Sequence, residues 1–165
     1  MKRRELEVTD LTQIREILDC CKVLNLALCD GETPYVLPMN FGYTLKDGAL
    51  TLYLHGGASG YKYELMEKNP NVAFSMYADV IPYEGNRPCQ YGNAYVSLLG
   101  RGKIEFVTQP QEKMEAMSIL MRSQTGKEFI FNERLVSIVQ VMRIRVTAYS
   151  AKRRPLPERI EKNLS

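Results

Sequence analysis

The alternation of apolar and polar residues along this chain predicts one N-terminal helix followed by a series of β-strands. The helix is expected at residues 11–21, where apolar side chains recur every three or four positions and Asp10 is placed to cap the first turn. Beyond it, apolar and β-branched segments alternate with turn signals such as Asp30-Gly31 and Lys46-Asp47-Gly48. The strands are expected at residues 23–29, 34–43, 49–55, 72–78, 90–107 and 138–149.

Two further helices are expected between these strands. One follows a glycine-rich loop, with Ser59 as its cap, and ends before Pro70, because proline disfavours helix in the residue before it. The other begins near Pro110 and is rich in methionine. Residues 80–89 contain two prolines and are expected to form a loop. Six strands and three helices, with hairpin connections in the first half, predict a mainly β fold, a small closed or nearly closed β-barrel with peripheral helices.

Composition and charge exclude several classes of protein. The chain has 165 residues, 45% hydrophobic and 25% charged, which fits one domain spanning residues 1–165, with 152–165 as an extended C-terminal arm. No apolar run is long enough for a membrane span or a signal peptide, so we expect a cytoplasmic protein. The four cysteines form no Cys-x-x-Cys pair, and we expect no metal site. The net charge of +3 and the short basic run at 152–154 do not indicate nucleic-acid binding.

The residues that point to chemistry lie in a glycine-rich loop and at the start of the helix after it. The loop follows His55, the one histidine of the chain, and free backbone N–H groups at a helix start favour phosphate. Ser59, Gly60 and Lys62 would add a hydroxyl, a flexible backbone and an ammonium group. A plain loop with a helix cap and a solvated lysine would give the same pattern. Neither a Walker A motif nor a Gly-x-Gly-x-x-Gly fingerprint is present.

The strand segment Leu37–Asn40 is the second part of the candidate site. Its backbone could hydrogen-bond the edge of a flat heterocycle, and an ordinary core strand is the alternative. Our working hypothesis is a phosphate-bearing cofactor with its phosphate at residues 56–62 and its rings against this strand. A Ser/His/Asp triad is not supported, because the chain has a single histidine and no nucleophile elbow.

Three segments of the chain resemble a known family. They are PYVLPMNFGY at Pro34–Tyr43, LYLHGGASGYK at Leu52–Lys62 and NPNV at Asn69–Val72. Together they resemble the flavin-nucleotide-binding split barrel of the pyridoxamine 5′-phosphate oxidase-related superfamily, and within it the 5-nitroimidazole-resistance (nitroimidazole reductase) group. The resemblance also covers residues 91–107 and 144–152, and the first two motifs are fairly specific together.

The resemblance implies a six-stranded antiparallel split β-barrel and a homodimer with two FMN molecules at the subunit interface. It implies an FMN-dependent oxidoreductase acting on small electron-poor substrates such as nitro-aromatics, with His55 as the catalytic candidate. The residues implied to contact FMN are Leu37, Pro38, Met39, Asn40, His55, Gly56, Ser59, Gly60 and Lys62.

The chain also departs from the true pyridoxamine phosphate oxidases. It has no tryptophan and lacks their arginine-rich flavin motifs and their tryptophan-containing C-terminal signature, so we do not expect pyridoxamine phosphate oxidation. Two alternatives stay open for the function. One is a flavin carrier or sensor without turnover, and the other is a haem-binding barrel with His55 as an axial ligand.

Overall fold

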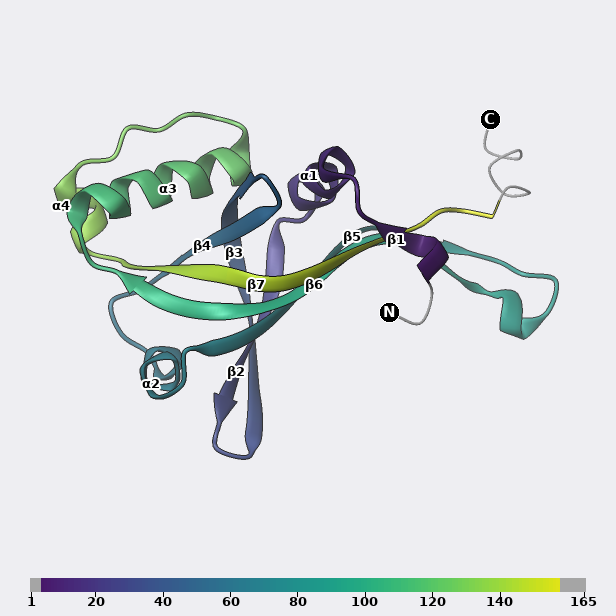
Figure 1. The fold of residues 1–165 in the computed structure, drawn as a ribbon, viewed down its shortest axis with the longest axis horizontal. Helices are drawn as coiled ribbons and strands as arrows, with labels where there is room; N and C mark the ends of the chain where they lie inside the picture. Colours follow the sequence, from purple (N-terminus) through teal and green to yellow (C-terminus); the bar gives the residue numbers. More distant parts are fainter. Residues whose placement is uncertain (1–3, 158–165) are drawn as a thin grey trace.

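Antiparallel strands make up most of the chain, and four α-helices lie around them (Figure 1). The computed structural model describes residues 4–157. The elements, in chain order, are η1 (Arg4–Leu6), β1 (Glu7–Val8), α1 (Leu11–Cys20), β2 (Val23–Asp30), β3 (Thr33–Lys46), β4 (Ala49–Gly56), α2 (Tyr61–Lys68), β5 (Asn71–Tyr83), η2 (Pro88–Gln90), β6 (Gly92–Val107), α3 (Pro110–Thr125), α4 (Glu133–Ser137) and β7 (Gln140–Arg154). In these residues no helix is long and apolar enough to cross a membrane.

The strand pairings close on themselves. The order runs β7-β4-β3-β2-β5-β6, and β6 pairs again with β7, so six strands form a ring of ladders. Every ladder is antiparallel, and the short β1 adds to the outside of β7. The prediction of a mainly β, antiparallel fold is therefore confirmed, with β1 as a seventh, short strand.

Two ladders of this ring are incomplete. β2 pairs with β5 only from Asn25 to Ala27, and β3 pairs with β4 only from Phe41 to Lys46. The β2–β3 hairpin, by contrast, is paired along its whole length. Its tip therefore leaves the sheet on both sides, and in Figure 1 it projects away from the other strands.

Alternate residues of the strands point inward and form the core. α1 closes one end of the barrel with Ile14, Ile17 and Leu18, and its first turn is capped by Asp10, whose carboxylate accepts from the Gln13 N–H at 2.9 Å. The large side chains with the least exposure are Phe41, Ile17, Leu18, Leu24, Leu26, Leu52, Leu54, Leu65, Met76, Leu98, Met142 and Ile144. A second, smaller apolar cluster holds α3 and α4 against the end of the sheet.

Four expectations about the elements were wrong in detail. Residues 80–83 belong to β5 rather than to a loop, because that part of β5 is an edge paired only with β6, where Pro82 is tolerated. Residues 152–154, expected to begin an extended C-terminal arm, are the end of β7 and pair with β6, and residues 158–165 of that expected arm lie outside the described residues. Gly60, not Ser59, is the N-cap residue of α2. Helix α4 was not predicted, because its five residues are too few for a periodic pattern.

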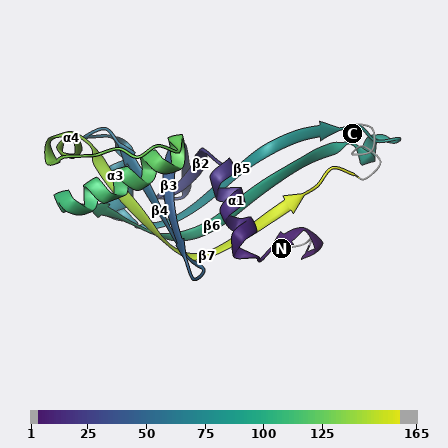
Figure 2. The ribbon, with the colours of Figure 1, turned by 90° about the horizontal axis from the view of Figure 1, so that it is seen from above.

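The paired ends of β5, β6 and β7 extend well beyond the barrel. Figure 2 shows them as a long arm that carries η2 near its tip. The ladder of β5 and β6 shifts register between Ala78 and Ile81, and Asp79 in this bulge has a positive φ of 54°. A bulge of this kind bends and twists a strand pair locally, and here it lies within the arm.

Gly42 of β3 allows α3 to pack closely against the barrel. A Cβ atom at this position would lie 2.4 Å from Leu120 Cα and 2.7 Å from Leu120 N, which are backbone atoms of α3. We expect Gly42→Ala to lower the free energy of unfolding by about 1–3 kcal/mol in urea titrations, because the helix must shift. Gly57→Ala is the control, since nothing lies within 4 Å of its Cβ. Equal stability of the two variants would contradict this packing account.

Candidate functional site

One edge of β3 is free where the barrel is split. Residues 33–40 pair with β2 on one side, while β4 pairs with β3 only as far as Phe41, opposite Leu54. In the described part of the chain, the other edge of residues 33–40 has no ladder partner. Its backbone N–H and C=O groups are therefore available to a ligand, as a flat heterocycle would require.

The four predicted residues of this strand do not share one face. Leu37 is half-buried against the core and Met39 is 7% exposed within it, whereas Pro38 and Asn40 point outward. The Asn40 amide nitrogen lies 3.4 Å from the Lys22 carbonyl and 3.3 Å from Gln124 Oε1. The side chains of Leu37 and Met39 thus serve packing, and Asn40 is engaged with neighbouring segments. What this strand offers a ligand is mainly its backbone edge.

His55 lies near the end of β4, opposite Val141 of β7. Its side chain is half-buried, and its Nδ1 atom is shielded from solvent without a hydrogen-bond partner among residues 4–157. Burial, followed by the positive charge of Lys62, lowers the pKa of His55 from its usual value of 6.5. The imidazole is therefore mostly neutral at pH 7, and one of its nitrogens lacks a partner that a bound group could supply.

The loop after β4 brings Lys62 and Tyr63 against the chain at Gly56. A Cβ atom on Gly56 would lie 2.4 Å from the Tyr63 hydroxyl and 2.9 Å from Lys62 Nζ, so a larger residue would displace the ends of both side chains. The Tyr63 hydroxyl donates to the Gly57 carbonyl at 2.7 Å, and Lys62 Nζ lies 5.1 Å from the centroid of the Tyr63 ring. Tyr63 therefore fixes the loop. The sequence did not single it out, because a buried tyrosine in a helix looks like a core residue.

The start of α2 carries no side-chain cap. Its N-cap Gly60 has φ 152°, a backbone conformation that favours glycine, and Ser59 is exposed and makes no capping hydrogen bond. The Tyr63 N–H donates to the Gly60 carbonyl at 3.0 Å, and the N–H groups of Tyr61 and Lys62 are left for solvent or for an anion. Ser59 and Gly60 lie where the sequence placed them, beside Lys62, but Ser59 does not have the capping role expected of it.

The loop and the free edge of β3 border the same gap. At one end of the gap Phe41 pairs with Leu54, next to His55. At the other end the rings of Tyr35 and Tyr61 meet edge-on at 5.8 Å, which links β3 to the start of α2. The structure therefore brings the two predicted parts of the site together. It places an imidazole, an ammonium group, uncapped N–H groups and a strand edge beside the point where β3 and β4 stop pairing.

The titration of His55 gives a direct test of this cluster. We expect a single imidazole signal in NMR spectra, with a pKa below 6.5, and we expect Lys62→Gln to raise it because a neighbouring positive charge is removed. Because the pKa of His55 is lower in the folded chain than in the unfolded chain, the unfolded chain binds the proton more tightly. The contribution of His55 to the free energy of unfolding is therefore lost as the pH falls through the unfolded pKa of about 6.5. An unchanged His55 pKa in the Lys62→Gln variant would show that the charge of Lys62 does not act on His55.

Comparison with known proteins places this architecture in a family. Residues 10–153 match the family described as pyridoxamine 5′-phosphate oxidase. Among solved structures, a candidate 5-nitroimidazole antibiotic resistance protein from Bacteroides thetaiotaomicron is 32% identical, with a TM-score of 0.75, over 89% of this chain and 86% of that one. No curated protein matches.

Two more distant structures share the fold. A flavocytochrome from Azotobacter vinelandii is 16% identical with a TM-score of 0.76, over 100% of this chain and 78% of that one. An FAD- and haem-binding protein from Mycobacterium smegmatis is 15% identical with a TM-score of 0.75, over 96% and 80%. These likenesses agree with the ring of strands described above. The match over residues 10–153 shows that the chain belongs to the pyridoxamine 5′-phosphate oxidase family.

Proposed function

We propose that this protein binds FMN at the gap between β3 and β4 and uses it to reduce small electron-poor molecules of the nitro-aromatic kind. The observation that carries the proposal is the buried Nδ1 of His55, which has no partner among residues 4–157 and lies beside the cation of Lys62. A buried polar atom without a partner is costly, and a ligand in the gap would supply the missing contact.

The residues around the gap fit a flavin nucleotide. Lys62 and the uncapped N–H groups at Gly60 and beyond would hold the phosphate, with the exposed hydroxyl of Ser59 beside them. The backbone edge of Leu37–Asn40 would hydrogen-bond the heterocycle, as an extra strand would. Gly56 leaves room for the Tyr63 hydroxyl and the Lys62 ammonium group beside the gap.

A bound flavin would supply the electron transfer, and the protein would supply position, charge and protons. His55 would donate a hydrogen bond or a proton from its imidazole at the edge of the gap. Lys62 would hold the phosphate end, which fixes the orientation of the rings against β3. The relative from Bacteroides thetaiotaomicron, with its candidate role in nitroimidazole resistance, supports an acceptor of this class.

Turnover is tested by anaerobic reoxidation of the reduced flavin. The FMN-loaded protein is reduced by light with EDTA as the electron donor and mixed with a nitroimidazole, and the return of the oxidised flavin spectrum is followed. We expect reoxidation faster than that of free reduced FMN at the same concentration. A rate no faster than free flavin would contradict the enzyme proposal and favour a carrier or sensor.

The proposal also includes assembly of the chain into a homodimer. Large apolar side chains lie open on the outer face of β3, β5 and β6, with Val36 60%, Tyr77 63% and Leu99 59% exposed. Tyr77 pairs with Ser97 and Leu99 with Ser75, so the two apolar side chains lie diagonally across the β5–β6 ladder. Apolar groups gathered in this way are typical of a protein interface, and a second copy of this chain would cover them.

Light scattering at low micromolar concentration is expected to give twice the chain mass of 18.9 kDa. Leu99→Glu should shift the protein toward monomer, because it introduces a charge into an apolar interface. Ile130→Glu is the control, since Ile130 is 98% exposed in the segment between α3 and α4. A parent chain that stays monomeric and still binds FMN tightly would overturn the proposal that FMN lies at the interface of a homodimer.

A further inference from the structure

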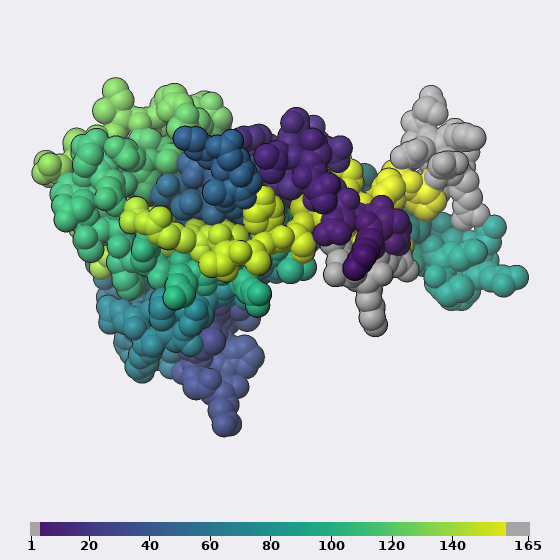
Figure 3. All heavy atoms as spheres, in the orientation of Figure 1, coloured from purple at the N-terminus to yellow at the C-terminus, as the bar shows by residue number. Residues whose placement is uncertain are grey.

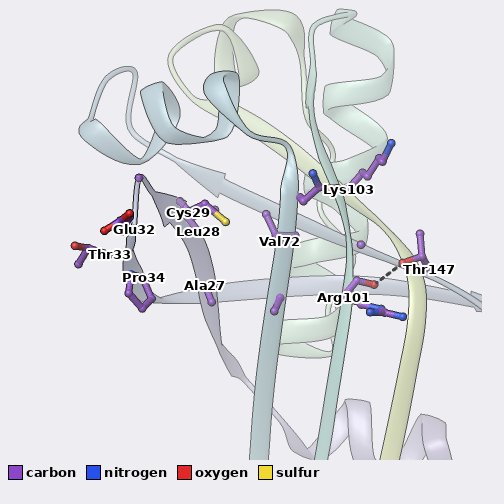
Figure 4. A pocket seen from close by; sticks show the side chains of 14 residues that line it. Ala27, Leu28, Cys29, Glu32, Thr33, Pro34, Val72, Arg101, Lys103 and Thr147 are labelled. Atoms are coloured by element: carbon purple, nitrogen blue, oxygen red, sulfur yellow. Dashed lines mark hydrogen bonds between the residues drawn. The ribbon is translucent and has the colours of Figure 1, made fainter.

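A hollow of about 730 Å³ lies beside the tip of the β2–β3 hairpin, on the side of β5. We call it the hairpin pocket. The hairpin, β5, β6 and β7 all contribute to its walls, and Figure 4 shows the hairpin facing the other three strands across it. Its lining includes Ala27, Pro34, Ala73, Arg101, Lys103 and Thr147.

The pocket lies where the ladder between β2 and β5 is incomplete. β2 pairs with β5 only as far as Ala27, opposite Ala73, while β5, β6 and β7 stay paired with one another around the pocket. Beyond Ala27 the hairpin therefore diverges from β5 and leaves a space between them. In Figure 3 the hairpin forms a separate projection below the barrel. The gap at His55 lies on the other edge of the hairpin, along β3.

Two cations without partners line this pocket. Arg101 and Lys103 are two positions apart on β6, so their side chains leave the same face of the sheet. Within residues 4–157, neither side chain makes an ion pair or a hydrogen bond, and Glu32 is the one acidic residue of the lining. On the same sheet, Arg143 and Arg145 are both paired with Glu105. The positive charge at the pocket is thus left available for an anion.

The rest of the lining is small and largely apolar. Ala27, Pro34 and Ala73 contribute apolar surface without polar side-chain groups. The side chain of Thr147 is already engaged, since its hydroxyl donates to the Arg101 carbonyl at 3.2 Å. A hollow of this size, with apolar walls and a few charged groups on one side, has the features of a small-molecule site.

We propose that the hairpin pocket binds small organic anions, with an aromatic or aliphatic body against the apolar walls and one sulfonate, phosphate or carboxylate group at Arg101 and Lys103. This site is separate from the gap at His55, because the two lie on opposite edges of the β2–β3 hairpin. The ligand class follows from the charge and the walls: the two cations select the anionic group, and the walls favour an attached apolar body over an inorganic ion.

The test uses naphthalenesulfonate and its neutral counterpart naphthalenesulfonamide, titrated into the full chain by NMR. We expect the sulfonate to shift the amide signals of residues 27–33, 71–73 and 101–103. The double variant Arg101→Gln/Lys103→Gln should weaken the sulfonate roughly tenfold, the contribution of two solvent-exposed charge contacts together, and leave the sulfonamide unchanged. Lys46→Gln/Arg134→Gln removes the same net charge at exposed positions outside the lining and should weaken neither ligand.

Three results would overturn the proposal. Equal affinity of the two ligands would show that charge plays no part, and signal changes confined to other residues would place binding elsewhere. Displacement of the sulfonate by saturating FMN would show that the two sites are one. Retained binding in the presence of FMN supports a separate site, and the sulfonate titration alone tests the pocket even if the chain binds no flavin.

Discussion

The His55→Gln variant is expected to fold and to bind FMN like the parent chain, yet to reduce a nitro-aromatic substrate about a hundredfold more slowly. Glutamine keeps hydrogen-bonding capacity but cannot titrate. The lowered pKa of His55 also predicts a pH dependence of the reduction rate, because the imidazole donates a proton as an acid in its protonated, cationic form. The rate of the parent protein should therefore rise as the pH falls toward this pKa, and the rate of the variant should not.

Stability and flavin affinity of the same variant decide between the roles of His55. Loss of both fold and FMN would make the residue structural. An unchanged rate of reduction with intact FMN binding would show that His55 is not catalytic, and the carrier proposal would gain. His55→Asn, which also cannot titrate, is a second variant for the same measurements if the glutamine does not fit beside Val141.

The Lys62→Ala variant is expected to weaken FMN about ten- to a hundredfold, which corresponds to the loss of one charge-assisted hydrogen bond of about 1.5–3 kcal/mol. Riboflavin lacks the phosphate and should lose much less affinity. Fluorescence titrations of both ligands measure the difference. Lys68→Ala, in the last turn of the same helix, is the matched control. Equal losses for FMN and riboflavin would place the lysine away from the phosphate.

The strands and the first helix could be predicted because their signals are local. Alternating burial in β2 and β4, and the cap of α1 at Asp10, follow directly from residue pattern. The ends of β5 and β7 could not, because proline and basic residues there are tolerated only by the particular pairing with β6. That pairing is set by tertiary structure, which a periodic pattern does not contain.

The candidate site could be predicted only in part, again because some of its features depend on tertiary structure. His55, Gly56 and Lys62 could be named because a lone histidine before a glycine-rich loop is a visible signal. The free edge of β3 could not be recognised, since it depends on where β4 stops pairing. The hydrogen bond of Tyr63 to Gly57, and the partner-free cations of the hairpin pocket, likewise depend on contacts that the sequence does not display.

The visible absorption spectrum of the protein as purified, with the flavin released and counted, tests the flavin proposal most directly. We expect the two-band spectrum of oxidised flavin, with FMN as the released compound and one molecule per chain after saturation and gel filtration. A Soret band without flavin absorption would contradict the proposal and favour haem at His55. A chain that takes up neither flavin nor haem under these conditions would contradict it as well.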